Sequence, residues 1–371
     1  MISKALHNKH KDNMHKVPCT LYRAGTSKGP FFLKNDLPSD TQLRNKMLLS
    51  IMGSPHSRQI DGIGGADSLS SKVAIISSSV KEEVDIDYLF CQVHIDIPSV
   101  NTALNCGNML SAVAPFAIEK GLVKAVHPET TVKIFNENTG SIVHALVQTP
   151  GGKISYSGNT IIDGVPGSAA PIKLTFLDSV GSNTGTLLPT GNVIDRIEGI
   201  NVSCIDVAVP MVILCASSLG KTGYESKKTL DADKEFLKNL ETIRQKAALK
   251  MGLGNVSSNV SPKVCLIAPP RHGGQITSRY FTPFDCHATH AVTGALCLSA
   301  ACLIPGTLAH NITKFPLPTS TLDEYEIEIE HPAGKIQTAI KTTKENNKID
   351  FPEASFIRTA RPLFEGKVLI A

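Results

Sequence analysis

The sequence predicts an α+β protein made of two similar halves. Its 371 residues are enough for two domains, and 42% hydrophobic against 19% charged residues is the composition of a globular protein. In each half, strand-like alternation leads through a polar, glycine-bearing turn into an apolar helix rich in small residues, first near residues 105–120 and again near 284–304. No literal repeat joins the halves, so the duplication is predicted from the order of the elements.

The first half is predicted to contain strands, one short helix and one long loop before its apolar helix. A strand, a turn and a second strand are expected over residues 17–33, followed by a helix over 40–52, a Gly/Ser loop over 60–71, and strands over 72–79 and 87–97. The apolar helix is expected from Leu110 to Lys120, with Gly121 as its C-terminal stop. Turn signals at 138–140 and 150–152 predict an antiparallel region over 130–176.

The second half is predicted to start near Pro189. One strand is expected within residues 201–216, a helix over 231–253, strands over 263–270 and 276–283, and then the second apolar helix. The predicted domains are a flexible tail (1–16), an N-terminal domain (17–188), a C-terminal domain (189–355) and a segment (356–371) that returns toward the N-terminal domain. If the two halves are arranged alike, the two helix starts face each other across a cleft and offer two anion-binding ends to one ligand.

The composition excludes several classes of function. The net charge of +4 is spread along the chain without a dense Lys/Arg run, and there is no Trp, so neither nucleic acid nor a membrane surface is an expected partner. Nine cysteines in irregular spacing are typical of buried thiols in a reducing compartment. No apolar stretch approaches the ~20 residues of a membrane helix, and the N-terminal segment holds no hydrophobic block of a secretory signal. We therefore expect a cytoplasmic protein.

The tetrapeptide Asn105-Cys106-Gly107-Asn108 is the first candidate site. It lies at the start of the first apolar helix, where unpaired backbone N–H groups favour negative charge. Such a position can bind a carboxylate, activate a thiolate or do both. Gly107 permits close approach of the backbone to a ligand, and the asparagine side chains can donate hydrogen bonds to carboxylate oxygens. The alternative is that Cys106 is only a small buried hydrophobe.

Lys72 and the turn RAGTSKG (residues 23–29) are the next candidates. Lys72 stands where the Gly/Ser loop enters an apolar strand, which predicts an amine at a cleft that can anchor a carboxylate and relay a proton. The alternative is a solvated surface lysine. In the turn, the Thr26 and Ser27 hydroxyls favour a carboxylate-binding role. The Walker pattern is missing, which excludes an NTP-binding loop.

The segment Cys286–His290 raises the alternative of a metal site. His287 and His290 are three residues apart, but no second pair with ligand spacing lies nearby, and HExxH and CxxC motifs are absent. We therefore expect no metal, and we interpret His290 as a hydrogen-bonding residue at the second helix start. Cys297 and Cys302 fall within the helix and are predicted to be core residues.

Several of these segments together resemble the PrpF-like isomerase family. The resemblance is carried by RAGTSKG, QIDGIGGADSLSSKVAI, NCGNMLSAVAPFAIEKGLV, PIKLTFLD, LLPTGN and HAVTGALC, and extends from about Val17 to the C-terminal IRTARPLFEG. Within the family, the chain is most similar to bacterial proteins grouped with 4-oxalomesaconate tautomerases. The resemblance implies a diaminopimelate-epimerase-like fold, with two pseudo-symmetric domains that each form a β-barrel-like sheet around a central helix and a site between them.

The resemblance also implies roles for individual residues. Lys72 matches the family's catalytic lysine and Cys106 its first-domain cysteine, while Asn105, Gly107 and Asn108 fall in its first carboxylate-binding helix start. The other substrate-binding residues that the resemblance implies are Thr26, Ser27, Arg279, His290, Thr293 and Gly294.

The implied reaction is a cofactor-free allylic 1,3-proton shift or cis-trans isomerisation of an unsaturated tricarboxylate-type acid, such as 4-oxalomesaconate, aconitate or 2-methylaconitate. Lys72 would be the main acid/base, and Cys106 a second proton donor or a positioning group. Ala291 occupies the place of the second cysteine of diaminopimelate epimerase, which argues against a symmetric two-thiol racemase. Two alternatives stay open: an amino-acid or hydroxy-acid epimerase, and a non-catalytic polycarboxylate-binding helper of an aconitase-like enzyme. The expected partner is a small anionic polycarboxylate, and a homodimer is one option for the assembly.

Overall fold

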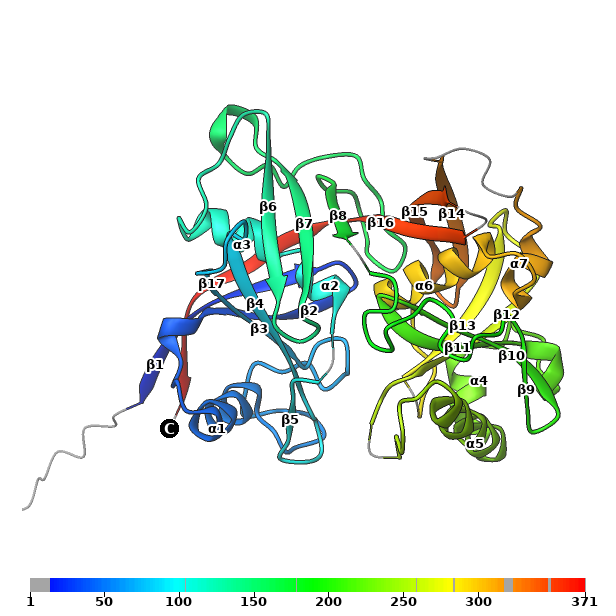
Figure 1. Cartoon of the computed structure of the whole chain (residues 1–371). Helices are drawn as coiled ribbons and strands as arrows, with labels where there is room; N and C mark the ends of the chain where they lie inside the picture. Colours follow the sequence, from blue (N-terminus) through cyan, green and yellow to red (C-terminus); the bar gives the residue numbers. More distant parts are fainter. Residues whose placement is uncertain are drawn as a thin grey trace, which may run out of the picture.

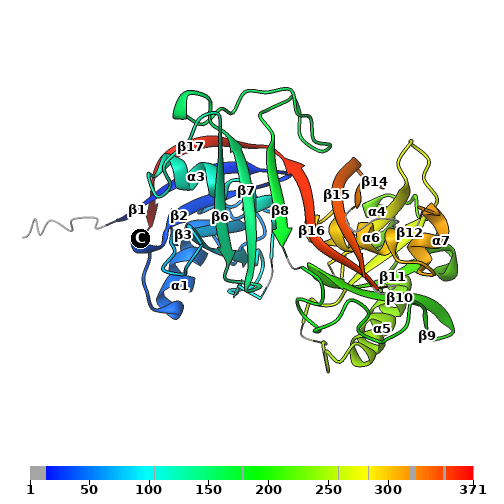
Figure 2. The ribbon, with the colours of Figure 1, turned by 45° about the horizontal axis from the view of Figure 1, so that its top comes forward.

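The protein consists of two β-rich lobes joined side by side (Figure 1). The computed structural model describes residues 14–370, apart from 104, 178, 258, 283, 317–322 and 346–347. Most of the expected flexible tail therefore lies outside the described residues, and the first strand begins at His15. In each lobe a curved sheet wraps around a buried helical segment (Figure 2). This is the α+β architecture of two similar halves that the sequence predicts.

The first lobe is a mainly antiparallel sheet around two short helices. Its strands are β1 (His15–Ala24), β2 (Ser27–Leu33), β3 (Lys72–Ser78), β4 (Ile86–Val93), β5 (Val100–Asn101), β6 (Glu129–Asn136), β7 (Ser141–Gln148), β8 (Ile172–Leu177) and β17 (Ala360–Ile370). Inside the sheet lie α2 (Gly107–Leu110) and α3 (Val113–Glu119), and α1 (Thr41–Met52) packs on the outer face. The 3-10 helices η1 (Lys34–Asp36) and η2 (Pro150–Gly152) lie in connections. Burial alternates along β6 because one face packs on the core and the other meets solvent.

The second lobe surrounds one helix that is apolar on every side. Its strands are β9 (Asp195–Ile197), β10 (Ile200–Val207), β11 (Val209–Cys215), β12 (Lys263–Ala268), β13 (Ile276–Phe281), β14 (Asp323–His331), β15 (Gly334–Glu345) and β16 (Lys348–Arg358). Its helices are η3 (Ala216–Leu219), α4 (Lys227–Ala232), α5 (Lys234–Lys250), α6 (Val292–Leu303) and α7 (Leu308–Thr313). Every residue of α6 is buried, as expected for a helix enclosed by a sheet. No helix in the described part of the chain is long and apolar enough to span a membrane.

The second lobe repeats the strand order of the first. In both lobes an antiparallel hairpin (β1/β2 or β10/β11) is followed by a parallel pair (β2/β3 or β11/β12) and an antiparallel pair (β3/β4 or β12/β13). The buried helical segment comes next, and then a strand parallel to the last one (β6 or β14). Strands β3 and β12 are therefore equivalent, and their first residues are Lys72 and Lys263.

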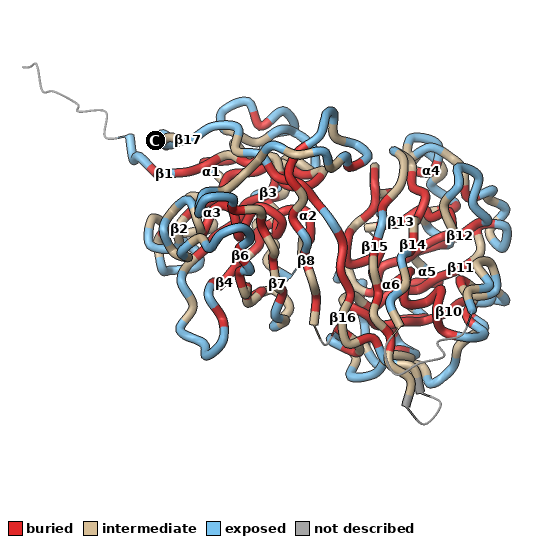
Figure 3. The backbone as a smooth tube through the Cα atoms, turned by 90° about the horizontal axis from the view of Figure 1, so that it is seen from above, coloured by how far each residue is buried: buried red, intermediate tan, exposed pale blue. Residues whose placement is uncertain are grey.

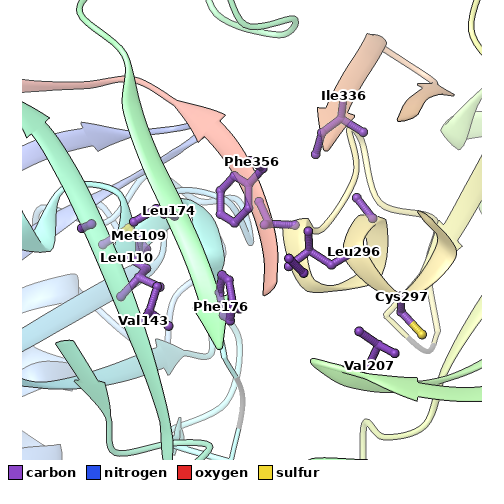
Figure 4. Close-up of a cluster of buried hydrophobic side chains, with 14 of the residues drawn as sticks. Met109, Leu110, Val143, Leu174, Phe176, Val207, Leu296, Cys297, Ile336 and Phe356 are labelled. Carbon is purple, nitrogen blue, oxygen red and sulfur yellow. The ribbon is translucent and has the colours of Figure 1, made fainter. Parts of the chain in front are cut away.

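Strand β16 belongs to both lobes. It pairs with β15 of the second lobe from Lys348 to Phe356 and with β8 of the first lobe from Glu353 to Arg358. The rings of Phe356 and Phe176 pack at this junction, with centroids 5.9 Å apart (Figure 4). One buried apolar core consequently continues from α2 to α6, and buried residues run through both lobes in Figure 3. Strand β17 then returns to the first lobe and pairs with β1.

Three predicted elements are divided in the structure. The single strand expected within 201–216 is the hairpin β10/β11, which turns at Ala208 (φ +60°), a residue without the usual turn signal. The helix expected over 231–253 is split into α4 and α5 at Asp233, whose side chain accepts a hydrogen bond from the N–H of Phe236 (3.0 Å) and caps α5. The helix expected over 110–120 starts at Gly107 and is interrupted between α2 and α3.

Shortening a buried side chain of α6 should destabilise the whole protein. Leu296 is fully buried in α6, so Leu296→Ala removes packed methyl groups and should lower the free energy of unfolding by about 2–5 kcal/mol. Chemical denaturation followed by circular dichroism measures this loss. Leu249→Ala on α5, where the side chain is 62% exposed, is the control and should change the same quantity by less than about 0.5 kcal/mol. Equal losses in both variants would contradict the packing described for α6.

Candidate active site

A cavity of about 380 Å³ has walls from both lobes. The first lobe contributes residues 105–108 and side chains of β3 and β4, and the second contributes residues 291–293 and side chains of β12 and β13. The predicted site residues that line it are Ser27, Lys72, Asn105, Cys106, Gly107, Asn108 and Thr293. The predicted site residues that do not are Thr26, Arg279, His290 and Gly294.

The starts of two helices face this cavity. Cys106 is the N-cap residue of α2, and Ala291 is the N-cap residue of α6. The first hydrogen bonds within the helices run from the N–H of Leu110 to the carbonyl of Cys106 and from the N–H of Ala295 to the carbonyl of Ala291. The N–H groups that precede them are not used by the helices and give each start a positive end.

Gly107 allows the two helix starts to approach each other. A Cβ atom placed on Gly107 would lie 2.8 Å from the Cβ of Val292, the first residue of α6. Real Cβ atoms do not approach this closely, so a larger residue at position 107 would push α2 and α6 apart. The glycine of the Asn-Cys-Gly-Asn segment is therefore needed for the contact between the lobes.

The amide of Asn108 is held in one orientation. Its Oδ1 accepts hydrogen bonds from Nε of Arg358 (3.1 Å) and from the N–H of Thr26 (3.4 Å). Because both partners are donors, the oxygen must face them, and the Nδ2 group is left to donate to a ligand. Gly25 (φ +54°) makes room for this side chain, since any Cβ there would collide with the amide.

Arg358 places a buried positive charge behind the helix start of α2. Its guanidinium donates to Oδ1 of Asn108 and to the carbonyl of Ile357 (2.9 Å), and it lies 5.4 Å from the ring centroid of Phe356. Among the described residues no carboxylate pairs with it. Burial lowers its pKa to about 10, so the group still carries its charge at neutral pH. The Arg358 charge therefore polarises Asn108 from the side opposite to the ligand.

Lys72 begins β3 with an amine that has only neutral partners among the described residues. Its side chain is 8% exposed, and its Nζ donates to Oε1 of Gln92 (2.8 Å) and lies 5.0 Å from the ring centroid of Phe90. Gln92 is itself held by a hydrogen bond from its Nε2 to the carbonyl of Ser71 (2.9 Å). An amine that is oriented but not paired with a carboxylate is free to bind one from a substrate.

The turn between β1 and β2 contributes a hydroxyl to the cavity. Ser27 is buried, and its Oγ has no hydrogen-bond partner among the described residues. A buried hydroxyl without a partner, on a residue that lines a cavity, leaves hydrogen-bonding capacity unused beside that cavity. Thr26 lies instead where the lobes touch, with its Oγ1 3.4 Å from Oγ1 of Thr289. Gly29, the last residue of RAGTSKG, lets β2 approach the carbonyl of Lys72, which a Cβ would meet.

The chain is similar to known proteins over nearly its whole length. A model of the PrpF protein family matches residues 14–371. The chain belongs to the PrpF family. It is 48% identical over 355 residues to the 4-oxalomesaconate tautomerase of Pseudomonas putida, with 96% of each chain covered. The crystal structure of methylitaconate-delta-isomerase matches with a TM-score of 0.78 and 37% identity over 96% of each chain.

A more distant match concerns the fold alone. A hydroxyproline epimerase from Agrobacterium vitis has a TM-score of 0.57 at 11% identity, with 95% of this chain and 92% of that chain covered. The predicted membership of the PrpF-like family and the predicted epimerase-like fold are both confirmed.

Two predicted site residues in the second lobe of the PrpF-family protein, Arg279 and Gly294, do not line the cavity, and the position of Tyr280 explains both. Arg279 and Tyr280 are neighbours on β13, so their side chains point to opposite faces. Tyr280 lines the cavity, whereas Arg279 donates from Nε to the carbonyl of Glu225 (2.7 Å) on the other face. Gly294 lies under the ring of Tyr280, with which any Cβ would collide. These contacts make Gly294 a support for Tyr280.

His290 is buried behind the start of α6. Its Nδ1 lies 2.8 Å from the carbonyl of Ala291, so this nitrogen carries the proton, and Nε2 accepts from the hydroxyl of Ser278 (2.9 Å). Burial lowers the pKa of His290 to about 3, which keeps the ring neutral at physiological pH. Within the described part of the chain, no three His, Cys, Asp or Glu side chains are placed to hold a metal ion.

His287 is a cavity residue that the sequence reasoning missed. Its Nδ1 accepts a hydrogen bond from the N–H of Thr289 (3.1 Å), so in the neutral ring the proton is on Nε2. Burial, with contributions from His290 and Lys72, lowers the pKa of His287 to about 3. The cavity therefore contains a neutral imidazole whose Nε2–H is available as a donor. The CHATH segment did signal two histidines, but the spacing alone could not tell which one faces the site.

Lys263 is the second cavity residue that was missed. It begins β12 and lines the cavity from the second lobe. A signal existed, because Lys72-Val-Ala-Ile-Ile and Lys263-Val-Cys-Leu-Ile open equivalent strands. This similarity of the two segments can be recognised only when the strand order shows that β3 and β12 correspond.

The contact between Gly107 and Val292 can be tested by its effect on stability. Gly107→Ala should lower the free energy of unfolding by about 1–3 kcal/mol, because the added methyl group meets Val292. At an unobstructed helix position the same change would stabilise the protein by up to about 1 kcal/mol. A double-mutant cycle with Val292→Gly, measured by chemical denaturation, should recover part of the loss. A Gly107→Ala variant more stable than the wild type would contradict the contact.

Proposed function

We propose that this PrpF-family protein is a cofactor-independent isomerase that shifts a proton along an unsaturated tricarboxylate-type acid. The observation that carries the proposal is the charge of the cavity, which gathers positive groups from both lobes. Asp285 is the only carboxylate among the described residues that line it, and it is paired with Lys227 (3.0 Å). A pocket between two lobes with this charge favours a small molecule with several carboxylates.

One substrate carboxylate binds, in this proposal, at the paired helix starts. The donors are the free N–H groups at the starts of α2 and α6, Nδ2 of Asn108 and the Ser27 hydroxyl. On the side of the first lobe, the amine of Lys72 becomes positively charged when it takes up the proton of the substrate, and it then faces the developing negative charge. Charge-assisted hydrogen bonds of this kind are shorter and about twice as strong as neutral ones, so they can fix the orientation of the substrate.

The proton steps are assigned to Lys72 and Cys106. A base removes the allylic proton next to a carboxylate or keto group, the charge spreads as a dienolate, and a proton returns at another carbon or after rotation about the former double bond. Lys72 is the main acid/base, and Cys106 is a second proton donor or positions the substrate. The helix starts and the Nε2–H of His287 stabilise the dienolate, since they are in place before the charge develops.

Within this class of substrate, we propose 4-oxalomesaconate or a close analogue. The 48% identity to a 4-oxalomesaconate tautomerase supports this choice over aconitate and 2-methylaconitate.

Several other properties stay predictions from the sequence. They are the absence of a cofactor, the homodimer, the cytoplasmic location and the domain limits 17–188 and 189–355. Thr26, Arg279, His290 and Gly294 are proposed to support the site from behind its wall.

An epimerase of amino or hydroxy acids is the competing enzyme. Such an enzyme needs a second thiol that faces Cys106 across the substrate. Ala291 takes the equivalent N-cap position on α6, and Cys106 is the only cysteine among the described residues that line the cavity. This asymmetry favours the isomerase. A non-catalytic binding protein is the third candidate and would bind tricarboxylates without converting them.

Proton NMR in D2O tests the reaction and names the substrate. The wild type is incubated separately with 4-oxalomesaconate, cis- and trans-aconitate and 2-methylaconitate. We expect conversion of one of them with deuterium at the allylic carbon, and a loss of at least about 100-fold in rate with Lys72→Met. Lys46→Met, at an exposed position of α1, is the control and should retain the rate. Wild type that binds these acids but converts none would favour the binding-protein alternative.

The role of Cys106 can be separated from binding. If its thiol delivers a proton, Cys106→Ala should lower kcat by about 100-fold or more while KM changes by less than about threefold. Steady-state kinetics on the substrate found by NMR measures both constants. A rise in KM with unchanged kcat would instead assign Cys106 to positioning the substrate.

A further inference from the structure

The cavity contains a second lysine with no partner of its own. The side chain of Lys263 is 9% exposed and lines the cavity from the second lobe. Among the described residues, its Nζ makes neither a hydrogen bond nor an ion pair. Burying such a group without a partner costs free energy, which a ligand in the cavity can offset.

Lys263 corresponds to Lys72 by the internal symmetry of the fold. Each is the first residue of a strand, β12 or β3, that runs parallel to the preceding strand and antiparallel to the next one. The N-cap residue is Cys106 on α2 and Ala291 on α6, so the thiol of the first lobe has no counterpart in the second. The amine does have a counterpart, so the two lobes present one lysine each to the same cavity.

The two lysines differ in their surroundings. Lys72 has an amide oxygen and an aromatic ring as partners, both of which stabilise a charged amine. Lys263 is buried near the positive charges of Arg244 on α5 and of Lys72, and Asp285 opposes them only in part. Burial first, and then these two charges, lower the pKa of Lys263 to about 7. Near neutral pH the amine of Lys263 in the free protein therefore exchanges between its charged and uncharged forms.

We propose that Lys263 binds a second carboxylate of the substrate and takes up a proton from solvent when it does so. The uncharged amine gains one proton and becomes an ammonium paired with the carboxylate, and no other bond changes. The inference rests on the proposed function for the substrate class, which it narrows to acids whose carboxylates reach both lobes. One carboxylate meets the helix starts and Lys72, and another meets Lys263.

The proposal predicts the direction of the pH dependence of binding. An anion favours the protonated amine, so below about pH 7 the affinity is constant. Above it the amine must first gain a proton, and the affinity falls by up to about tenfold per pH unit. The other titratable groups in the described wall are Lys72, His94, Cys106, Tyr280, Asp285 and His287. Burial keeps the pKa of His287 at about 3 and that of Tyr280 well above its usual value, so neither titrates between pH 5 and 9.

Isothermal titration calorimetry with tricarballylate tests the inference. This saturated tricarboxylate cannot undergo an allylic shift, so the measurement reports binding alone. Titrations between pH 6.5 and 8.5 in two buffers of different ionisation enthalpy give the affinity and the number of protons taken up. For the wild type we expect uptake approaching one proton at pH 8 and a Kd that rises with pH.

Two variants at the same position separate charge from titration. Lys263→Met should bind about 10- to 100-fold more weakly at pH 6.5, without proton uptake. Lys263→Arg keeps a fixed charge and should bind with little dependence on pH and no uptake, while His94 and Cys106 are unchanged. Lys246→Met, on the outer face of α5 with its side chain 52% exposed, is the control and should behave as the wild type.

The possible results test the role of Lys263 and the isomerase function separately. Wild-type affinity in Lys263→Met, or undiminished proton uptake in Lys263→Arg, would overturn the role of Lys263 and assign the uptake to Lys72, His94 or Cys106. If Lys263→Met does not fold, as judged by circular dichroism, the uptake measured with Lys263→Arg still decides. A wild type that binds tricarballylate as expected but converts no unsaturated acid would refute the isomerase and leave the Lys263 inference standing.

Discussion

The approach of α2 to α6 at Gly107 and Val292 is the contact on which the site depends. It brings two helix starts from different lobes to one cavity, which neither lobe could enclose by itself. Two more glycines play comparable parts, since Gly25 makes room for Asn108 and Gly29 lets β2 approach the backbone of Lys72. The site is thus built by close approach of main chains, and the side chains that act on a ligand occupy the space that remains.

Unneutralised positive charge is the second property of the site. Arg358 and Lys72 have only neutral partners among the described residues, and Lys263 has none, although all three are largely buried. Each costs stability in the free protein, because a buried charge or amine is best paired. In the function proposed here, a polyanionic ligand supplies the missing partners, so these residues exchange stability of the free protein for affinity.

Much of the fold and part of the site could be predicted from the sequence. Strand alternation, the Asn-Cys-Gly-Asn segment and the loop before Lys72 identified the elements and the first-lobe half of the cavity. The second lobe was harder for physical reasons. On β13 a shift of one residue separates Tyr280, in the cavity wall, from Arg279 on the opposite face, and composition does not fix that register. Lys263 looks like an ordinary strand-opening lysine until the correspondence of the two lobes is known.

The pairing of β1 with β17 has a consequence for folding. Strand β1 finds one of its two neighbours only in β17 (Ala360–Ile370), on the far side of the whole second lobe in sequence. Until these two strands meet, one edge of β1 stays open to wrong partners, which is a recognised route to aggregation. The strands β9–β16 of the second lobe come from one continuous stretch of chain. The sheet of the first lobe therefore closes through a contact of much longer range in sequence, and contacts of that kind form slowly.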